Sequence, residues 1–458
     1  MVGLPGLNTL SATGSSIHTP TASGIYAAAG IEATSPSPVI ATSIGALAAP
    51  ASGVSRWLDA ILFTRPRCGT VADVLDLKNR FPAITEGAHQ GWARFDGPAG
   101  TQVVDSAIAA TSAWQRSGNN ANSHGSFAAA EACDALFEQV QGAIGRLLNV
   151  EPSGVMFGPS TTANVFSITR AIGRDLRPGD EIICTQLDHD SNISPWLLVA
   201  EDTGATVRFA QFDAATGRLH PDAVTGLLTD RTRWVAVTGA SNAIGTMPDV
   251  TTITAAAHAA GAKVMVDGVH LTPHAPVDVT AIGCDVYSTS SYKWYGPHAS
   301  ATWIEPELLD RLHAYKVRPA PDTGPGRFML GTPSYESFAG IDAAAQFLLD
   351  TGMDNIRAYE RQLFTLLLEG LLADERVTVY GPHDLVDRAP TLAFNVAGRT
   401  AAEVAGSLAA ERIAVWDGHY YALEAMAALG IEGAVRAGIA VYLTTHDVER
   451  LLDVVDRI

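Results

Sequence analysis

Lysine is scarce in this chain, and one lysine lies in a segment suited to chemistry. Only four of the 30 lysine and arginine residues are lysines: Lys78, Lys263, Lys293 and Lys316. Lys293 stands in SSYKWYGPH (290–298), between two aromatic residues and before a Gly-Pro turn. A lysine amine is nucleophilic only when deprotonated, and a desolvated pocket lowers its pKa. The segment indicates either a reactive lysine or a buried lysine that aromatic rings merely shield.

Serines beside this lysine are suited to an anion. Ser288, Ser290 and Tyr292 alternate as they would at the end of a strand. GPSTTAN (158–164) opens a predicted helix, where free backbone amides and hydroxyls suit a phosphate. An ordinary helix N-cap is the other reading of that segment.

The remaining polar candidates follow predicted strands. Strand candidates lie at 155–157, 181–186 and 264–267, and residues 231–246 form an apolar β-run that ends in a polar loop. With a helical stretch at 251–263, they predict βαβ units and a parallel sheet. Open α/β sheets bind ligands at the carboxyl ends of their strands. We therefore expect one crevice to gather the residues that follow these strands, together with the lysine: Ser160, Thr161, His189, Asn242, Asp267 and Lys293.

Two of these residues keep an alternative reading. Asp267 ends an apolar strand, where a carboxylate needs a cation or several donors. A protonated pyridine nitrogen is one such cation, and a helix cap or turn is the alternative. The ring of His189 could stack on a cofactor or belong to an ordinary loop. His270 and His274 lie four residues apart, but the proline between them argues against a helical zinc pair, and no metal is predicted.

Composition excludes several classes of partner. The formal net charge is −18 without a basic cluster, which argues against nucleic acid and anionic membranes. The four cysteines, Cys68, Cys133, Cys184 and Cys284, show no paired spacing, so a reduced cytoplasmic setting is expected. No apolar run is long enough for a membrane span.

The pattern along the chain predicts three regions. Residues 1–70 form a low-complexity extension rich in Ala, Ser, Thr, Gly and Pro. Residues 71–335 form a large α/β domain. Residues 336–458 form a smaller α+β domain, with a helical stretch at 339–373 and strands at 377–380, 391–396, 413–417 and 434–444, and residues 71–95 are expected to pack with it.

Five motifs in order resemble a known family. SSYKWYGPH, VDGVHLTPHAPVDV (266–279), ASNAIGTMPDV (240–250), LDHDSNISPW (187–196) and RFMLGTP (327–333) are similar to the cysteine desulfurase-like branch of the class V aminotransferases, over about 75–458. The resemblance implies pyridoxal 5′-phosphate (PLP) as cofactor. It also implies fold type I, with a mostly parallel seven-stranded sheet in the large domain, and a homodimer with shared active sites.

The resemblance assigns roles by position. Lys293 would bind the cofactor covalently and serve as catalytic base, Asp267 would pair with the pyridine nitrogen, and His189 would stack on the ring. Asn242 and His270 would lie near the ring hydroxyl. The phosphate would be held by Ser160, Thr161, Ser290 and Tyr292, with Thr332 from the other subunit. Arg436 would grip the substrate carboxylate.

One departure from the branch decides the expected function. Cysteine desulfurases carry a mobile cysteine shortly after a Gly-His pair, but here WDGHYYALEA (416–425) places Tyr421 there, and no cysteine follows Cys284. Trp416 stands where desulfurases usually have an arginine, so Trp416, Tyr420 and Tyr421 are predicted to form a roomier aromatic wall suited to a bulky S-substituent. Trp416, Tyr421 and His419 are predicted to bind the substrate.

We therefore expect a PLP-dependent C–S lyase that acts by β-elimination on an S-substituted L-cysteine or its sulfoxide, in small-thiol or natural-product metabolism. The alternatives are a decarboxylating oxidative deaminase, a desulfurase-like enzyme, an amino-acid epimerase and a PLP-binding protein without turnover. The intact Lys293 and Arg436 argue against the last.

Overall fold

A computed structural model describes residues 77–458 of the chain. The predicted extension over residues 1–70 and Cys68 lie outside the described residues.

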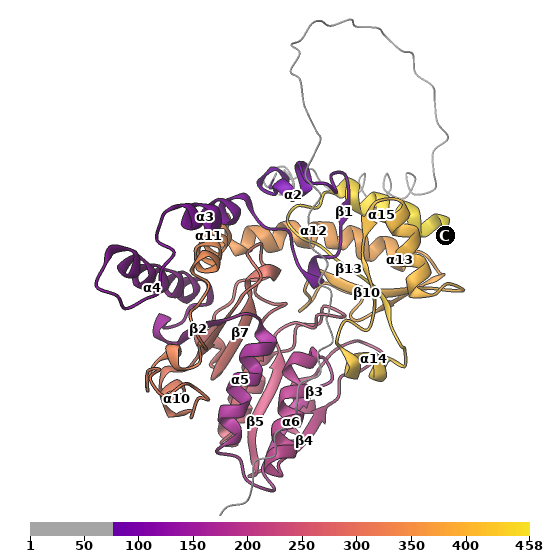
Figure 1. Ribbon diagram of the computed structural model, residues 1–458. Coiled ribbons are helices and arrows are strands. Elements are labelled where there is room, and N and C mark those ends of the chain that lie inside the picture. The colour runs from indigo at the N-terminus through magenta and orange to yellow at the C-terminus, as the bar shows by residue number, and fades with distance from the viewer. Residues whose placement is uncertain (1–76) are drawn as a thin grey trace, which may run out of the picture. The chain divides into compact units, whose positions relative to one another are not determined.

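A seven-stranded sheet forms the centre of the molecule (Figure 1). Its strands run in the order β2 (Val155–Gly158), β8 (Ser300–Ile304), β7 (Val286–Ser290), β6 (Lys263–Asp267), β5 (Thr232–Thr238), β3 (Glu181–Thr185) and β4 (Thr206–Ala210). Only β8 runs against its neighbours, pairing antiparallel with both β2 and β7. The α/β fold with a mostly parallel seven-stranded sheet is therefore confirmed.

Both faces of this sheet are buried, and successive side chains along each strand point to opposite faces. Ile182, Trp234 and Met265 pack on one face, with α5 (Thr161–Gly173) and α6 (Ser194–Thr203). Ile183 and Val235 pack on the other face, in the larger core. Four short or medium helices complete the connections: α7 (Pro221–Thr225), α8 (Val250–Ala259), α9 (Val279–Ile282) and α10 (Pro306–Arg311).

Helices that are far apart in the sequence pack together. Helix α11 (Tyr335–Thr351) contacts α3 (Asp105–Arg116) and α4 (Ala128–Leu148). Short helical segments lie at α2 (Pro82–Thr85), η2 (Lys78–Arg80), η3 (Gly97–Ala99), η4 (Pro152–Gly154), η5 (Asp190–Asn192), η6 (Ser291–Lys293) and η7 (Pro325–Arg327).

The C-terminal part holds a second, antiparallel sheet. Its four strands run in the order β12 (Trp416–Gly418), β13 (Ala434–Gly438), β10 (Thr391–Val396) and β9 (Val377–Tyr380). Helices α12 (Met353–Leu372), α13 (Ala401–Ala410), α14 (Leu423–Leu429) and α15 (Thr445–Arg457) accompany it. Strand β1 (Ala93–Arg94) pairs with β11 (Ile413–Ala414), so residues 93–94 do join the C-terminal part. The domain boundary near residue 335 stays a prediction.

The helical stretch predicted over 339–373 is confirmed, and it is divided into α11 and α12 at Gly352, which has a φ of +82°. Two other local predictions were wrong. Strand β13 ends at Gly438 and does not extend to residue 444. A Cβ atom at Gly438 would lie 2.2 Å from the Pro98 side chain, so the backbone closely approaches Pro98 there. Tyr292 does not continue the β7 alternation, because the chain turns into η6 after Ser290.

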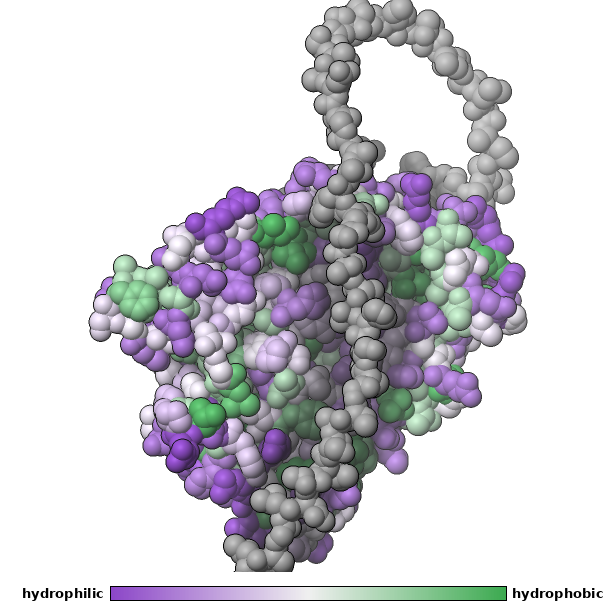
Figure 2. Space-filling model, viewed as in Figure 1, coloured by the Kyte–Doolittle hydropathy of each residue, from purple (hydrophilic) through white to green (hydrophobic). Residues whose placement is uncertain are grey.

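The outer surface in view is largely hydrophilic, with scattered hydrophobic patches (Figure 2). Among the described residues, no helix is both long enough and apolar enough to cross a membrane.

Candidate active site

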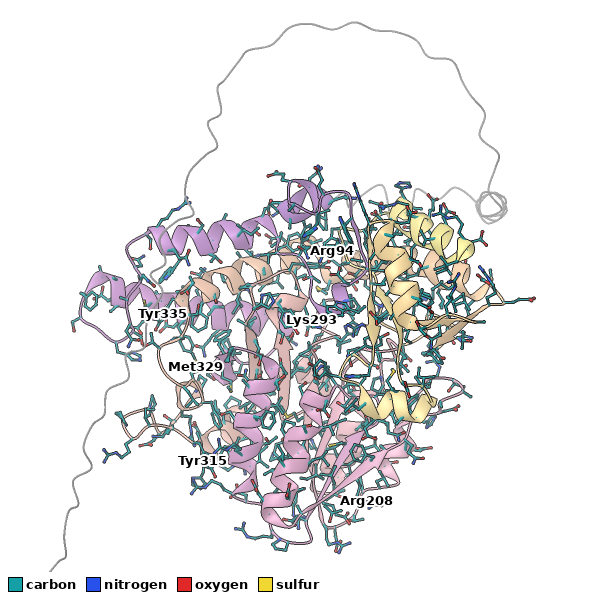
Figure 3. All side chains as sticks on the ribbon, turned by 45° about the vertical axis from the view of Figure 1, so that its right-hand side comes forward. Arg94, Arg208, Lys293, Tyr315, Met329 and Tyr335 are labelled. Carbon is teal, nitrogen blue, oxygen red and sulfur yellow. The ribbon has the colours of Figure 1, made fainter. Side chains whose placement is uncertain are left out.

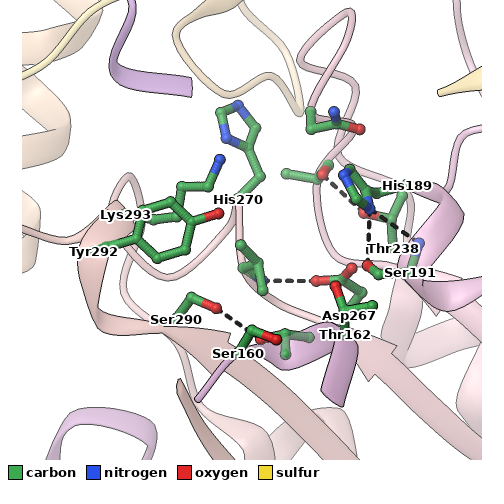
Figure 4. A pocket seen from close by; sticks show the side chains of 14 residues that line it. Ser160, Thr162, His189, Ser191, Thr238, Asp267, His270, Ser290, Tyr292 and Lys293 are labelled. Atoms are coloured by element: carbon green, nitrogen blue, oxygen red, sulfur yellow. Dashed lines mark hydrogen bonds between the residues drawn. The ribbon is translucent and has the colours of Figure 1, made fainter. Parts of the chain in front are cut away.

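A pocket opens at the carboxyl ends of the parallel strands. This is the edge at which open α/β sheets bind ligands. Lys293 and Tyr292 lie on one side of it and His189 on the other, with Ser160 and Ser290 at its base (Figure 4). The lining comprises Ser160, Thr161, Thr162, His189, Ser191, Thr238, Ala240, Asn242, Asp267, Val269, His270, Ser290, Tyr292 and Lys293.

Lys293 differs from the other lysines in having no carboxylate partner among the described residues. Lys78, Lys263 and Lys316 each form an ion pair with an aspartate. Lys293 follows β7 in η6, where the central sheet meets the C-terminal part (Figure 3), and donates a hydrogen bond to the carbonyl of Pro98. Burial, and then the charge of Arg436, lowers the pKa of Lys293 to about 7. At neutral pH much of this amine is uncharged and nucleophilic.

Asp267 ends β6 as a buried carboxyl, 5% exposed. Its side chain accepts one hydrogen bond, from the Val269 amide at 3.0 Å. Burial raises the pKa of Asp267 to about 6, against the opposing effects of that amide and Lys293. A buried carboxylate with so few donors is suited to a cationic ligand atom.

His189 presents a neutral ring to the pocket. Its Nδ1 accepts from the Ser191 amide at 3.0 Å, which fixes the ring orientation. Burial, with the nearby charges of Lys293 and Arg436, lowers the pKa of His189 to about 4. A flat uncharged ring at this position is suited to stacking on an aromatic ligand.

Asp188 is a neighbour that the sequence reasoning missed. Its buried carboxyl accepts from Thr185 Oγ1 at 2.5 Å and from Asn192 Nδ2 at 2.8 Å, so it holds the turn that carries His189. Burial raises the pKa of Asp188 to about 8. The acidic residue beside a candidate histidine in LDHDSN was the available signal. Thr238, Ser191 and Thr162 were also missed: Thr238 is the last residue of β5, Ser191 lies two residues after His189, and Thr162 follows Thr161.

One end of the pocket is built for an anion. Helix α5 begins at Thr161, and the Ser160 side chain caps it by accepting from the Ala163 amide at 3.1 Å. The hydroxyls of Thr161 and Ser290 lie 2.8 Å apart at this helix start. The positive end of the helix dipole and these hydroxyls together suit a phosphate.

The C-terminal sheet contributes a cation beside the pocket. Arg436 on β13 is buried, 4% exposed, and donates from one terminal nitrogen to the Asn242 carbonyl at 2.9 Å. Its guanidinium lies over the Tyr420 ring, 4.3 Å from the centroid, and its Nε has no partner. Burial lowers the pKa of Arg436 to about 10, so it stays charged at neutral pH.

The other predicted residues lie at or beyond the edge of the pocket. Tyr421 is 65% exposed and stacks on His189 with the ring centroids 5.5 Å apart. Trp416 is half exposed and pairs with Arg436 across β12 and β13. His419 and Thr332 are exposed and do not line the pocket.

Comparison with known proteins matches this geometry to a family. The Aminotransferase class-V family model matches residues 94–451. This chain belongs to the class V aminotransferase family.

Its relatives in this family include cysteine desulfurases. A cysteine desulfurase of Yersinia pestis (strain Pestoides F) is 34% identical over 318 residues, covering 66% of this chain and 77% of the relative. The structure of the cysteine desulfurase CsdA from Escherichia coli is 28% identical with a TM-score of 0.76, covering 85% of this chain and 98% of that one. The apo cysteine desulfurase from Thermococcus onnurineus NA1 is 26% identical with a TM-score of 0.79, covering 83% and 97%.

This class V aminotransferase family member is a PLP-dependent enzyme, and the pocket fits that cofactor. Asp267 lacks a cationic partner, which a protonated pyridine nitrogen would supply. The buried Oδ1 of Asn242 has no partner, while its Nδ2 donates to Tyr420 at 2.9 Å. His270, another buried residue of the pocket, shares a hydrogen bond with Thr391 at 3.0 Å. The hydroxyls at the start of α5 lie where a phosphate group is needed.

Proposed function

We propose that this enzyme is a C–S lyase that acts on an S-substituted L-cysteine or its sulfoxide. The observation that carries the proposal is the absence of a thiol from the described part of the pocket, combined with an otherwise fitting PLP site. A desulfurase needs such a thiol to take sulfur from its substrate, whereas an elimination needs only a base and a leaving group.

The described cysteines are unsuited to sulfur transfer. Cys133, Cys184 and Cys284 are all buried, and none lines the pocket. Burial raises the pKa values of Cys184 and Cys284, which disfavours their thiolates. The sequence has no cysteine after Cys284. These facts support a reaction without a persulfide.

The segment that carries Tyr421 is anchored at both tyrosines. The Tyr420 carbonyl accepts from Asn242, and its hydroxyl donates to the Ala434 carbonyl. The Tyr421 carbonyl accepts from the Asp190 amide at 2.7 Å. Both tyrosines have left-handed φ angles, 54° and 59°, which the surrounding contacts must hold in place. An anchored turn supports a fixed aromatic wall for an S-substituent and disfavours a swinging loop.

In this proposal the chain's own residues divide the work. PLP, when bound, supplies the electron sink that acidifies the substrate Cα proton. Asp267 would hold the pyridine nitrogen, His189 the ring face, and Ser160, Thr161, Ser290 and Tyr292 the phosphate. Asn242 and His270 would hold the ring hydroxyl. Arg436 would orient the substrate carboxylate.

Lys293 would move the proton in this reaction. Its Nζ accepts the Cα proton, and the Cβ–S bond then breaks with its electron pair leaving on sulfur. The leaving group takes up a proton, so an S-substituted cysteine releases a thiol and its sulfoxide releases a sulfenic acid. Hydrolysis of the remaining fragment gives pyruvate and ammonia.

The experiment that tests this function is product analysis on a panel of S-conjugated cysteines and their sulfoxides. We expect pyruvate in an amount equal to the released thiol, or to the released sulfenic acid when the substrate is a sulfoxide, without oxygen consumption. We expect little alanine or persulfide from free L-cysteine. Mass spectrometry with and without oxygen separates the alternatives. Oxygen-dependent loss of carbon dioxide would indicate an oxidative deaminase, and exchange of the Cα proton alone would indicate an epimerase. Robust alanine formation from free cysteine would overturn the lyase assignment.

A companion variant tests the role of the anchored turn. Tyr421→Cys is expected to give no efficient sulfur donor, because attack also requires a mobile loop and a lowered thiol pKa. The measurement is alanine and persulfide formation from free cysteine, with Tyr421→Ser as the matched control. Efficient persulfide formation by Tyr421→Cys alone would show that only the missing thiol separates this chain from a desulfurase.

We further propose that the working unit is a homodimer in which Thr332 completes the partner's phosphate site. Thr332 is exposed and outside the pocket of its own chain, which supports a role in another subunit. Mixing Lys293→Ala with Thr332→Asp under subunit exchange is expected to restore up to about half of a dimer's activity, because one of two symmetric sites becomes intact. Verified mixed dimers without activity, or a fully active monomer, would rule out the shared site.

A further inference from the structure

A second cavity is lined by charged residues that the proposed reaction does not use. It lies between α12 and the loop that joins β9 to β10. The residues that matter are three arginines, a buried acid–histidine pair and one aromatic ring: Arg357, Arg361, Arg388, Glu360, His274 and Phe364.

Arg388 is a buried cation without a hydrogen-bond partner. It is 9% exposed, and none of its three guanidinium nitrogens has a partner in the described part of the chain. The Phe364 ring lies 5.0 Å from its central carbon, which partly compensates the charge but leaves every N–H group unpaired. Asp384, an opposing charge that acts on Arg388, already pairs with Arg218 at 2.6 Å. Burying a cation in this state is costly unless an anion joins it.

The backbone around Arg388 is fixed on both sides. The Ala389 amide donates to the Gly245 carbonyl at 2.8 Å, and the Met247 amide donates to the Asp387 carbonyl at 2.9 Å. Arg388 itself forms a β-bridge with Thr246. The guanidinium is thus held at the cavity by a rigid segment.

The remaining charges make the cavity positive. Arg357 and Arg361 are exposed at its edge. The single acid, Glu360, is already bound to His274 at 2.8 Å, and burial raises the pKa of its carboxyl. Three guanidinium groups therefore face one acid that has its own partner.

We propose that this cavity binds a small oxyanion, with Arg388 as its main ligand and Arg357 and Arg361 at its mouth. A guanidinium fork matches the paired oxygens of phosphate, sulfate or a carboxylate.

The cavity adjoins the candidate active site on two sides. The His274 ring lies 5.0 Å from that of His270, and Gly245, which contacts the Arg388 loop, is close in sequence to Asn242. A bound anion would therefore stabilise two segments that shape the PLP pocket.

The test is calorimetric titration of the PLP-loaded enzyme with inorganic phosphate, with sulfate and acetate as parallel probes. Because the phosphate group of bound PLP occupies the active-site phosphate position, the added inorganic phosphate reports on binding elsewhere. Arg388→Gln is expected to weaken binding at least about tenfold, since charge-assisted hydrogen bonds are lost. Arg436→Gln and the exposed Arg399→Gln should leave phosphate affinity unchanged, which separates this cavity from the proposed substrate site.

A second variant keeps the test decisive if Arg388→Gln does not fold. Arg357→Gln changes an exposed residue at the mouth and should weaken phosphate binding several-fold while preserving the wild-type Tm without anion. Phosphate should raise the wild-type Tm more than that of either variant. The proposal is overturned if the wild type binds none of the three anions, or if the foldable variants bind phosphate as tightly as the wild type.

Discussion

Lys293→Ala is expected to abolish covalent attachment of PLP and to lower turnover by at least about 10²–10⁴-fold, the usual contribution of a positioned general base. The amine of Lys293 is the one lysine amine in the described chain without a carboxylate partner, and it lines the pocket. Lys263→Ala is the matched control, because Lys263 pairs with Asp285 at 2.6 Å, away from the pocket.

The measurement is borohydride reduction of the loaded enzyme followed by peptide mass spectrometry. The wild type and Lys263→Ala should carry reduced cofactor on Lys293, and Lys293→Ala should carry none. Cofactor fixed on Lys263 or Lys316 would contradict the assignment of the whole site.

The same residue predicts how cofactor loading depends on pH. The pKa of Lys293 is lowered to about 7, so its neutral fraction rises as pH increases through that value. The rate of PLP uptake by the apoenzyme should therefore rise from pH 6 to about 8 and then level off, whereas an unperturbed lysine, with a pKa of about 10.4, would give a rise that continues beyond pH 9.

Arg436→Gln is expected to raise the KM for an amino-acid substrate by about 10²-fold, with PLP retained. A bidentate guanidinium–carboxylate pair supplies two charge-assisted hydrogen bonds, each worth about 1.5–3 kcal/mol. The guanidinium is buried, charged, and has a free Nε beside the pocket, so its removal leaves the substrate carboxylate without a cation.

Steady-state kinetics and the visible spectrum of the loaded enzyme check this prediction. Arg399→Gln, a change of the same kind on the surface of the C-terminal part, should match the wild type in both. Arg436→Lys should recover only part of the affinity, because an ammonium lacks the planar fork. An unchanged kcat/KM in Arg436→Gln would remove Arg436 from substrate binding.

The amino-acid sequence was sufficient to predict an α/β fold and the edge of the sheet at which the pocket lies. Apolar runs ending in polar residues identified strands β3, β5 and β6, and parallel strands must bring their carboxyl ends to one edge. That rule alone placed His189, Asn242 and Asp267 near Lys293, although 104 residues separate His189 from Lys293. The missing cysteine at Tyr421 could also be read directly from the residue type.

Which polar groups have a hydrogen-bond or ion-pair partner could be seen only in the folded structure. The unpaired guanidinium of Arg388, the carboxyl of Asp188 that holds the His189 turn, and the anchored left-handed turn at Tyr420 depend on contacts between distant segments. The burial that shifts the pKa values of Lys293 and Arg436 likewise arises where the two sheets meet. Periodicity along a chain reports which face a residue occupies, but the energy of a buried charge depends on what faces it across the fold, and that is fixed only when the chain is packed.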